Sequence, residues 1–478
     1  MQFIIRVSPE ITIKSSPVRK KAIRLLISNI KSHFKENNIK NYELVFSWDR
    51  IDLFLKDDKN GLIVSNILKN IFGIIYFLEV IESDYIEFLD AYKKVSSFYL
   101  EKITNKTFAV RVKRSGNHNF KSSDLERYIW WEFFKENQKS KVNLKNPEIT
   151  VLVNIIDNKL FVVKNKVKWQ WGFPTWFCDR VLSLISWWFD STVASYLMMK
   201  KWVKMDFLFF NMWWKTHELW VKQLCYYLYN KYSISYNSNF ISIDFSPLIK
   251  KLLESWDPKY RSVLLKRYML KISSKIADEN DYYALVKWDS LWQVSSQTLQ
   301  NISLIDKSSD TVVLRPLISY DKEDIINIAK NIWTYDFAKS MPEYCWVVSD
   351  NPSTKAKEDI ILNQEKQIWY NIIDEIIKTK KIFKVNYMLE NEVKISNDIE
   401  IVSKISEQDV LIDIREEEKK IKNPLILNKI KILEIPFYEI NNKFWDLDKN
   451  KKYYLYCDKW ILSKLHGLYL KDMWYKNV

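Results

Sequence analysis

The alternation of apolar and polar positions in the first 170 residues predicts short strands separated by amphipathic helices. The predicted strands are Phe3–Val7, a hairpin over Tyr42–Leu55, Ile74–Ile81, Thr107–Val112 and a hairpin over Ile149–Val163. The predicted helices are Pro17–Asn37, Leu62–Ile71, Tyr85–Tyr99 and one that begins after the capping residues Ser122, Ser123 and Asp124. This order of elements is typical of two successive α+β modules.

From residue 171 to about 380 the pattern changes to a repeated order of strand, turn and helix. The predicted strands are Val181–Ile185, Asp206–Phe210, Ile241–Phe245, Ala284–Val286 and Thr311–Leu314. Such alternation predicts a doubly wound parallel sheet that helices cover on both faces, with ligands at the carboxyl ends of its strands. After residues 386–404, which carry little signal, a last α/β segment is predicted with strands Val410–Ile414, Ile430–Ile435 and Lys452–Tyr456.

The stretch Val181–Lys201 combines an apolar strand, a turn rich in serine and a helix. The turn is predicted over Ser186–Ser191, with helix-forming residues over Ala194–Lys201. Backbone N–H groups at the start of a helix have no partner within the helix, and the helix dipole favours negative charge there. This turn is therefore a predicted anion site, and phosphate is the usual occupant of such a site.

A phosphate-binding turn needs glycine, because only a residue without a Cβ lets the backbone approach a phosphate closely with a positive φ. This turn instead contains Trp187 and Trp188, and the whole chain has 5 glycines and 21 tryptophans, whereas average usage would give roughly 33 glycines. Tryptophan is also doubled at positions 130–131 and 213–214, and it follows Lys201, where a helix-ending glycine is expected. We hypothesise that most of these tryptophans are glycines encoded by UGA, a codon that some bacteria read as glycine. An aromatic-rich core is the alternative.

The composition narrows the classes of function. The formal net charge is +15, which favours a polyanionic partner such as RNA, although a solvated lysine-rich surface explains it equally well. Four cysteines form no disulfide framework and indicate a reducing, cytoplasmic setting. The first residues show no signal-peptide pattern, and no long apolar window predicts a membrane span.

Basic residues gather in the predicted second module. They are Arg111, Lys113, Arg114, Lys121 and Arg127. His118 and Phe120 lie among them and are suited to stacking on, or hydrogen bonding with, an RNA strand. The cluster predicts an RNA-binding face, and an ordinary solvated basic surface is the alternative.

Further candidate loops follow predicted strands in the second half of the chain. With glycine at positions 288 and 292, Lys287–Thr298 indicates a second nucleotide-binding loop. Arg315–Lys322 offers cations for phosphate, and Met341–Cys345 places a thiol in a later loop. Cys457 follows the last predicted strand and precedes a helix. Backbone N–H groups and the helix dipole at such a position lower the pKa of a thiol. A buried, inert cysteine is the alternative.

Several of these motifs resemble known families. With glycine at positions 187 and 188, Ser186–Ser191 resembles the pyrophosphate loop (PP-loop) of ATP-pyrophosphatases. The run Phe108–Ile129 resembles a THUMP domain, an RNA-binding module of tRNA-modifying enzymes, and Cys457–Ser463 resembles the active-site loop of a rhodanese domain. In this order, and over almost the whole chain, the motifs resemble the tRNA 4-thiouridine synthetase family, also called tRNA sulfurtransferase or thiamine biosynthesis sulfurtransferase.

The resemblance implies a multidomain chain of α/β and α+β folds. The implied domains are a ferredoxin-like module over residues 1–80, a THUMP domain over 81–170, a PP-loop ATP-pyrophosphatase domain over 171–385, a linker over 386–404 and a rhodanese-like domain over 405–478. The implied reaction moves sulfur from a cysteine desulfurase to uridine 8 of tRNA, with ATP adenylating the uridine. Further implied partners are a small sulfur-carrier protein for thiamine thiazole synthesis and a second copy of the chain in a homodimer.

The resemblance also assigns roles to individual residues. Cys457 would accept sulfur as a persulfide, and Cys345 would release it by forming a disulfide with Cys457. Asp190 would organise metal or phosphate, with helix capping as the alternative role. Lys322 would stabilise developing negative charge, with an ordinary surface lysine as the alternative. The implied ATP-binding residues are Leu184, Ile185, Ser186, Trp187, Trp188, Ser191, Lys266, Trp288 and Gln297, and the implied tRNA-binding residues are the five basic residues named above.

Mg²⁺ is expected with ATP from the class of reaction. A metal site held by the protein itself is not expected, because the four histidines, including His217, show no paired spacing. Cys178 and Cys225 have no motif around them and are predicted to be structural.

Two other functions stay open at this point. In the first, the cell inserts tryptophan at positions 187, 188, 288 and 460. Indole rings then block the loops, and the chain is a catalytically inactive tRNA-binding protein. The second alternative is an ATP-pyrophosphatase with another substrate, such as a lysidine-forming or amide-forming ligase. The two thiols of Cys345 and Cys457 speak against it, because amide formation needs neither.

Overall fold

The computed structural model describes residues 1–478 except 138, 169–177, 202, 213–214, 340–349, 369–370, 391–398, 403, 428–429, 459, 474 and 476. The chain divides into two compact units, Met1–Phe173 and Pro174–Val478. Each unit has its own sheets and its own buried apolar side chains.

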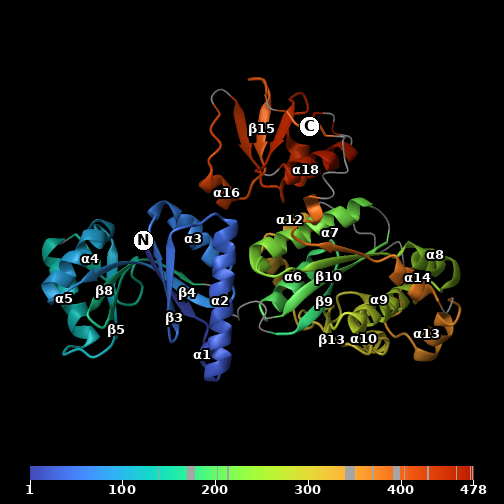
Figure 1. Ribbon diagram of the computed structural model, residues 1–478, viewed down its shortest axis with the longest axis horizontal. Coiled ribbons are helices and arrows are strands. Elements are labelled where there is room, and N and C mark those ends of the chain that lie inside the picture. Colours follow the sequence, from blue (N-terminus) through green and yellow to red (C-terminus); the bar gives the residue numbers. More distant parts are fainter. Residues whose placement is uncertain are drawn as a thin grey trace. The chain divides into compact units, whose positions relative to one another are not determined.

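One eight-stranded sheet runs through the first unit in the order β2-β3-β1-β4-β8-β7-β5-β6 (Figure 1). The strands are β1 (Gln2–Val7), β2 (Tyr42–Ser47), β3 (Arg50–Leu55), β4 (Ile74–Asp84), β5 (Thr107–Ser115), β6 (Lys141–Val142), β7 (Ile149–Ile156) and β8 (Lys159–Lys168). The helical segments are α1 (Pro9–Thr12), α2 (Ser16–Glu36), η1 (Asp58–Asn60), α3 (Gly61–Leu68), α4 (Phe88–Ile103) and α5 (Ser122–Glu136). The pattern of apolar positions predicted every strand of this unit except the short β6.

The two predicted modules of this unit share their sheet, because β4 pairs with β1 along one side and with β8 along the other. The β4–β8 pairing is antiparallel and extends from Tyr76 opposite Lys168 to Asp84 opposite Lys159. β4 is therefore longer than the predicted Ile74–Ile81. Its last residues, Glu82–Asp84, are polar and give no strand pattern, and only the pairing with β8 makes them a strand.

The start of α5 differs from the prediction that serines cap it. The helix begins at Ser122, and its N-cap residue is Lys121. The backbone N–H of Lys121 donates a hydrogen bond to the Asp124 carboxylate at 2.8 Å. The acidic residue of the first turn therefore supplies the cap, as it does in a capping box, and the serines lie inside the helix. α4 also begins later than predicted, at Phe88 instead of Tyr85, because residues 85–87 connect it to β4.

The second unit contains the predicted doubly wound sheet, in the order β13-β12-β9-β10-β11-β14. Its strands are β9 (Arg180–Ile185), β10 (Lys204–Asn211), β11 (Asn239–Asp244), β12 (Ala284–Val286), β13 (Val312–Leu314) and β14 (Lys381–Lys384). The first five are parallel, and β14, which the pattern did not predict, adds an antiparallel edge beside β11.

Helices cover both faces of this sheet, with α6 and α7 on one face and α9 and α10 on the other (Figure 1). The helical segments are α6 (Phe189–Met199), α7 (Lys215–Leu228), η2 (Tyr229–Ser233), α8 (Ser246–Ser255), α9 (Arg261–Glu279), η3 (Ser295–Gln297), α10 (Leu299–Asp306), α11 (Lys322–Asn331), α12 (Tyr335–Lys339), α13 (Glu358–Glu365) and α14 (Ile372–Lys378). Apolar side chains of β9, β10 and β11 form one core with those of α8, α9 and α14.

A three-stranded parallel sheet, in the order β16-β15-β17, forms the end of the second unit. Its elements are β15 (Val410–Asp413), α16 (Glu417–Lys422), β16 (Lys431–Glu434), α17 (Ile440–Lys443), η5 (Phe444–Asp446), β17 (Tyr453–Tyr456) and α18 (Ile461–Asp472). Aromatic contacts join it to α7, since Trp220 lies 4.7 Å from Tyr469 and Tyr227 lies 6.1 Å from Phe437, measured between ring centroids.

The predicted linker over residues 386–404 is only partly described, because residues 391–398 and 403 lie outside the described residues. Its first part is not a bare connection, since Met388 and Leu389 are buried together with the preceding Val385. These apolar residues follow β14 and belong to a core.

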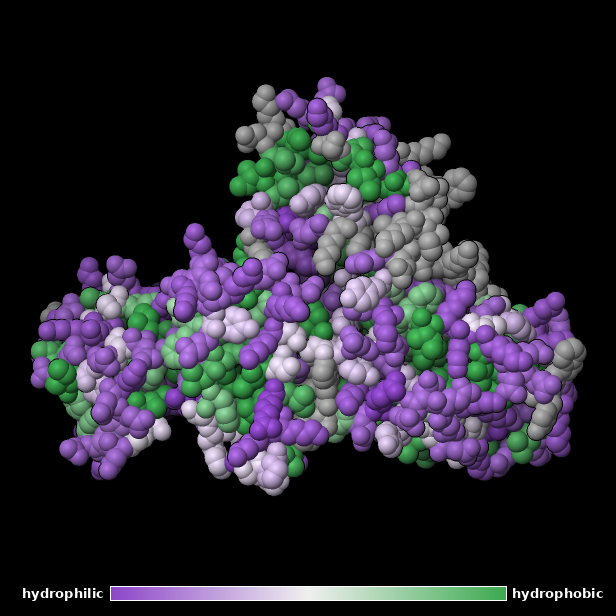
Figure 2. Space-filling model, in the orientation of Figure 1, coloured by the Kyte–Doolittle hydropathy of each residue, from purple (hydrophilic) through white to green (hydrophobic). Residues whose placement is uncertain are grey.

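Hydrophilic residues cover most of the face seen in Figure 2, with hydrophobic patches between them. This distribution agrees with a chain that has 74 lysines and arginines and 59 aspartates and glutamates. Within the described part of the chain, no helix is both long enough and apolar enough to span a bilayer.

A buried carboxylate connects the amino-terminal ends of the central strands of the second unit. Asp206 of β10 is fully buried and accepts hydrogen bonds from the Tyr282 hydroxyl at 2.6 Å and the Arg180 guanidinium at 2.9 Å. It also accepts one from the backbone N–H of Asn239 at 2.8 Å. Burial and the nearby carboxylate raise the pKa of Tyr282, so its hydroxyl stays protonated and keeps donating. Arg180 and Asn239 are the first residues of β9 and β11, and Tyr282 lies just before β12. Together with β10, which carries Asp206, four strands are thus held at their spacing by one side chain.

We predict that Asp206→Asn lowers the free energy of unfolding of the second unit by about 2 to 4 kcal/mol, because it leaves a cation and a backbone N–H without a charged partner. The matched control is Asp278→Asn on the exposed side of α9, which should change stability by less than about 0.5 kcal/mol. Urea unfolding of both variants measures the difference. Equal midpoints for the two variants would contradict the role of Asp206.

A buried histidine makes the C-terminal part of the second unit sensitive to acid. His466 of α18 is fully buried, with its ring 5.6 Å from Trp220 and 6.1 Å from Phe437. Burial lowers the pKa of His466 from 6.5 to about 3. The unfolded chain therefore takes up a proton near pH 6.5, whereas the folded chain does not until near pH 3. The contribution of His466 to the free energy of unfolding is therefore complete above pH 6.5. It is lost progressively as the pH falls from 6.5 towards 3.

We predict that His466→Phe removes this part of the acid sensitivity. Between about pH 7.5 and about pH 4.5, the native chain should lose about 2 to 3 kcal/mol of unfolding free energy relative to the variant. Urea titrations of both proteins across this pH range test the prediction. His33, which is buried in the first unit, is unchanged in both proteins and cancels in the comparison. Parallel pH curves would show that His466 does not contribute.

Candidate active site

The two nucleotide loops predicted from the sequence meet at the carboxyl edge of the second unit's parallel sheet. β9 lies between β10 and β12, and the chain runs from β9 through β10 to β11 on one side before it returns to β12 on the other. Open α/β sheets bind ligands at such a topological switch point. Residues 186–188 follow β9 and residues 287–298 follow β12, so both loops border the switch point.

The loop after β9 is shorter than predicted, because α6 already begins at Phe189. Ser191 therefore lies in the first turn of the helix. Its hydroxyl accepts a hydrogen bond from the backbone N–H of Ser186 at 3.0 Å and lies 2.9 Å from the Ser186 carbonyl oxygen, to which it can donate. The two predicted serines thus hold the turn closed against the start of α6. The N-cap residue is Trp188, whose side chain makes no capping hydrogen bond.

The structure joins two of the predicted catalytic residues in an ion pair. The Lys322 ammonium lies 3.0 and 2.9 Å from the two carboxylate oxygens of Asp190. Asp190 is buried in the first turn of α6, and Lys322 is the first residue of α11, with its side chain 42% exposed. The ion pair therefore connects two helix starts, and it holds a half-exposed ammonium group beside the loop that follows β9.

Indole rings fill the same loop. The rings of Trp187 and Trp188 lie edge to face with centroids 5.1 Å apart, and the Trp187 ring stacks on His217 at 6.3 Å. The Lys322 ammonium lies 5.5 Å from the centroid of the Trp188 ring. With tryptophan at both positions, large side chains stand where a phosphate-binding turn has open backbone.

Behind the second loop lies a buried cluster of charges. Asp289 is 1% exposed, and three cations each lie 3.1 Å from its carboxylate, those of Lys266, Lys287 and Arg315. Burial opposes ionisation of Asp289, but the three cations hold its pKa far below the usual range. Burial lowers the pKa of Lys287 to about 8. Arg315 also pairs with Asp306, and the cluster still has more positive than negative groups, which suits a bound anion.

The remaining predicted ATP-binding residues differ in burial and in the hydrogen-bonding groups that a nucleotide could contact. Gln297 is 5% exposed, and its Oε1 atom has no hydrogen-bond partner among the residues that the structure describes, whereas its Nε2 atom lies 3.5 Å from Asp289. Trp288 packs against the core. The side chains of Leu184 and Ile185 are buried in the sheet, so only their backbone could meet a ligand. A buried acceptor without a donor is the feature of this group that suits a base amino group.

Cys457 lies between the end of β17 and the start of α18 and is 5% exposed. Its sulfur accepts a hydrogen bond from the backbone N–H of Ser463 at 3.3 Å, and its thiol donates to the Ser463 hydroxyl at 3.3 Å. Ser463 is in the first turn of α18. A helix N–H group aimed at the sulfur, together with the helix dipole, favours negative charge on that atom.

Arg415, which no sequence pattern singled out, fixes the cysteine loop. Its guanidinium is buried and lies 2.7 Å from the Asp413 carboxylate and 3.1 Å from that of Asp458. Asp458 is the neighbour of Cys457, so the arginine ties the loop to the end of β15. The signal was available in the sequence, because Asp413 ends a buried strand and Arg415 follows it, and charged residues at such a strand end serve loops or ligands.

The other cysteines have different environments. Cys345, the predicted disulfide partner of Cys457, lies outside the described residues, so this pairing stays a prediction. Cys225 is buried in α7, and burial raises the pKa of its thiol well above the usual value. Cys178 is half-buried. The environment of Cys225 agrees with the structural role predicted for it.

All five basic residues predicted to bind RNA have exposed side chains in the first unit. Arg111 and Lys113 alternate with buried residues along β5, and Arg114 follows them near its end. Lys121 is the N-cap of α5, and Arg127 lies within that helix. The end of β5 and the first half of α5 therefore carry exposed positive charges.

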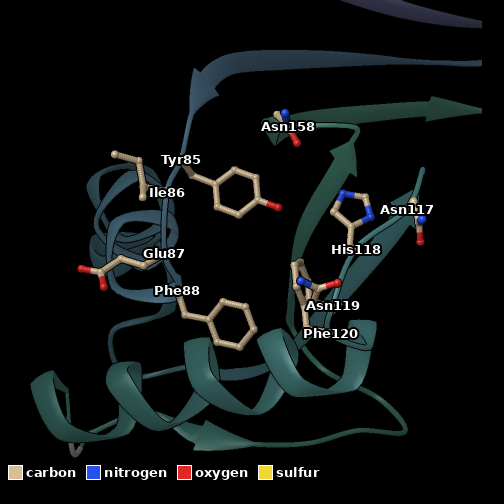
Figure 3. A pocket seen from close by; sticks show the side chains of 9 residues that line it. All are labelled: Tyr85, Ile86, Glu87, Phe88, Asn117, His118, Asn119, Phe120 and Asn158. Carbon is tan, nitrogen blue, oxygen red and sulfur yellow. The ribbon is translucent and has the colours of Figure 1, made fainter.

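Beside these charges the first unit has a cavity of about 460 Å³. In Figure 3 the rings of Tyr85, from the connection between β4 and α4, and of Phe88, the first residue of α4, lie across from those of His118 and Phe120, from the loop before α5. The Arg114 guanidinium donates to the His118 carbonyl at 3.1 Å and lies 5.8 Å from the Phe120 ring centroid. Aromatic rings next to cations are the combination on which unpaired bases stack.

Three models of known protein families match successive parts of the chain. The model of the thiamine biosynthesis protein ThiI matches residues 177–370, that of the THUMP domain matches residues 86–163, and that of the ThiI ferredoxin-like domain matches residues 2–77. Within the described residues, no three His, Cys, Asp or Glu side chains gather to hold a metal ion.

Relatives and solved structures extend this similarity to the whole chain. The chain is 40% identical over 478 residues to the tRNA sulfurtransferase of Yersinia pestis (strain Pestoides F), with 100% of this chain and 99% of the relative covered. The tRNA sulfurtransferase of Yersinia pseudotuberculosis serotype O:1b (strain IP 31758) gives the same identity and coverage.

The fold is similar to the crystal structure of a 4-thiouridine synthetase–RNA complex with bound ATP, with a TM-score of 0.68 and 22% identity over 80% of this chain and 98% of that one. A protein of Pyrococcus horikoshii Ot3 has a TM-score of 0.53 and 18% identity over 70% of this chain and 100% of its own. The full-length identity to curated relatives and the three family matches together show that this chain belongs to the tRNA sulfurtransferase (ThiI) family.

Proposed function

We propose that this chain is an ATP-dependent tRNA uridine 4-sulfurtransferase that converts uridine 8 of tRNA to 4-thiouridine. The observation that carries the proposal is the presence, in one unit, of two helix starts with polar groups arranged to favour an anion. One is the loop before α6 with its Asp190–Lys322 ion pair, and the other is the start of α18 with the Cys457 sulfur. The first suits the phosphates of ATP, and the second suits a persulfide.

The proposed ATP site is the switch point between β9 and β12. The start of α6, with Ser186 and Ser191, would hold the phosphates, and the positive cluster around Asp289 would add charge from the second loop. The unpartnered Oε1 atom of Gln297 would accept a hydrogen bond from the amino group of adenine. A solved 4-thiouridine synthetase that shares the fold has ATP bound, which supports the choice of ATP as the ligand.

Adenylation makes the uridine oxygen a leaving group. Uridine O4 attacks the α-phosphate of ATP and releases pyrophosphate, so that O4 can later depart with AMP. Negative charge grows on the phosphate oxygens in this step, and the Lys322 ammonium is the group proposed to stabilise it. Asp190 would orient Lys322 through the two hydrogen bonds that it accepts.

The sulfur step begins with a persulfide on Cys457, formed by transfer of sulfane sulfur from a cysteine desulfurase. The terminal sulfur attacks C4 of the adenylated uridine, a C–S bond forms and AMP leaves. The Cys345 thiolate then attacks the Cys457 sulfur, which frees 4-thiouridine and leaves a Cys345–Cys457 disulfide. A dithiol reductant of the cell supplies two electrons and restores both thiols.

The tRNA is proposed to bind the exposed basic residues at the end of β5 and the start of α5. Phosphate contacts would come from these residues, and the aromatic cavity beside them would take an unpaired base. The matched THUMP model covers this region, which supports the assignment.

Further components of the proposal rest on the family. Residues 405–478 are proposed as a rhodanese-like domain, because Cys457 follows a parallel strand and faces a helix start. Mg²⁺ would arrive with ATP and be held by its phosphates together with Asp190. A small sulfur-carrier protein for thiazole synthesis and a homodimer are proposed as further partners.

A second candidate function has one observation in its favour. The rings of Trp187 and Trp188 fill the loop that should receive phosphate. With tryptophan at these positions in the cell, the chain would be a catalytically inactive homologue that still binds tRNA.

We predict that Cys457→Ser abolishes formation of 4-thiouridine in tRNA but leaves ATP binding intact, because serine cannot carry a persulfide. Liquid chromatography of nucleosides from tRNA incubated with ATP, a cysteine desulfurase and each protein measures the product. Cys178→Ser is the matched control and should keep full activity. Full activity of Cys457→Ser would overturn the persulfide role.

We predict that replacing both Lys113 and Arg114 with Gln weakens tRNA binding and lowers the slope of log affinity against log salt by about 1 to 2, because two phosphate contacts are lost. Filter binding at several salt concentrations measures both quantities. Lys20→Gln, on the exposed side of α2, is the control with the same change of charge per residue. An unchanged salt slope in the double variant would place the RNA elsewhere.

A further inference from the structure

Left-handed backbone conformations single out three tryptophans. Among the described residues, nine other than glycine have a positive φ, and six of these are Asn or Asp. The other three are Trp292 (φ 64°), Trp333 (φ 63°) and Trp460 (φ 58°). Asn and Asp tolerate this region because their short polar side chains bond locally, whereas a bulky side chain clashes with its own backbone. Tryptophan is thus the outlier in this set.

Trp333 occupies the glycine position of a helix-ending motif. After α11, the backbone N–H of Thr334 donates to the Ala329 carbonyl at 2.9 Å and that of Trp333 donates to the Lys330 carbonyl at 3.0 Å. This pair of bonds defines the Schellman motif, in which the left-handed residue is usually glycine. The end of α2 has the same two bonds, with Asn38 (φ 53°) at the left-handed position.

Trp460 is the N-cap of α18 and lies three residues after Cys457. Its side chain makes no capping hydrogen bond, but its carbonyl accepts from the backbone N–H of Lys464 at 3.0 Å and from the Ser463 hydroxyl at 3.1 Å. The left-handed turn is therefore part of the arrangement that aims the N–H of Ser463 at the Cys457 sulfur. Position 460 therefore needs a residue that readily adopts positive φ, because this conformation keeps the hydrogen bond from Ser463 to the Cys457 sulfur in place.

Trp292 lies in the loop after β12, where its backbone N–H donates to the Gln297 carbonyl at 3.1 Å. That bond closes the loop that carries Gln297 past the nucleotide site. The three positions thus lie in or next to the elements of the candidate active site, namely in the loop after β12, in the turn that ends the helix beginning with Lys322, and in the loop of Cys457.

Packing does not explain a tryptophan at these positions. The side chains of Trp292 and Trp460 are 70% and 62% exposed, and that of Trp333 is 46% exposed. Trp256 shows the contrast, because it is 2% exposed, has a negative φ and donates its indole N–H to the Gln364 carbonyl at 3.0 Å. The structure accommodates a tryptophan at 256, whereas the backbone is strained at the three left-handed positions. The rings of Trp292 and Trp460 lie largely in water, and Trp333 contacts Tyr438 at 5.5 Å between ring centroids while it stays 46% exposed.

We propose that positions 292, 333 and 460 carry glycine in the protein that the cell makes, inserted at UGA codons. The scarcity of glycine in the chain, 5 residues beside 21 tryptophans, is what such reassignment produces. The backbone geometry adds the second, independent reason, since glycine alone adopts positive φ without steric cost. This inference does not depend on the proposed function, because it concerns which residue is present and not what the site does.

The decisive experiment is a peptide mass spectrum of the chain isolated from the cells that make it. Trypsin should release the peptides that span positions 288–307, 331–339 and 460–464. The expected result is glycine mass at 292, 333 and 460, with UGA at each codon in the gene. Tryptophan mass or a UGG codon at any of the three positions overturns the proposal, whatever the activity of the protein.

A second measurement tests the strain itself on recombinant protein with tryptophan at all positions. Each of Trp292→Gly, Trp333→Gly and Trp460→Gly should raise the midpoint of thermal unfolding, because glycine relieves the left-handed strain. Trp256→Gly is the matched control and should lower the midpoint, because it leaves a cavity and an unpaired carbonyl. If none of the three variants unfolds at a higher temperature than the parent, the argument from backbone geometry is wrong.

Discussion

The pairing of β9 with β10 on one side and β12 on the other is the constraint on which the nucleotide site depends. It brings residues 186–188 and 287–298 to one edge of the sheet, although about 100 residues separate them in the sequence. At the opposite edge, Asp206 binds groups at the start of β9, β11 and β12 and so holds these strands at their spacing. A rigid sheet with one fixed edge is what allows short loops at the other edge to form a defined site.

Buried ion networks support both candidate anion sites. Asp289 with its three cations lies behind the nucleotide loop, and Arg415 with its two carboxylates lies beside the cysteine loop. A buried charge is costly unless it is paired, so these networks are ordered only in one arrangement of the loops that carry them. Each network therefore fixes the direction of backbone groups that a phosphate or a sulfur anion would meet.

Backbone conformation and residue identity disagree at positions in this same region. The turn that ends α11, the loop after β12 and the loop after Cys457 each contain a left-handed tryptophan. Either the loops of this family member are strained and obstructed, in which case catalysis is lost and RNA binding remains, or the residues are glycine and the loops are open. The two interpretations give the same fold, because the sheet and its core do not depend on these exposed side chains.

The sequence alone predicted most strands and helices, because apolar periodicity is a local signal that folding preserves. It also predicted the order of the motifs and the residues of both loops, through turn chemistry and the resemblance to one family. It did not predict that β4 and β8 join two modules into one sheet, that β14 adds an antiparallel edge, or that Asp190 and Lys322 form an ion pair. Such contacts join residues far apart in the sequence, and they leave no periodic pattern in either segment. Only tertiary packing decides them, since the partners meet after the sheet has formed.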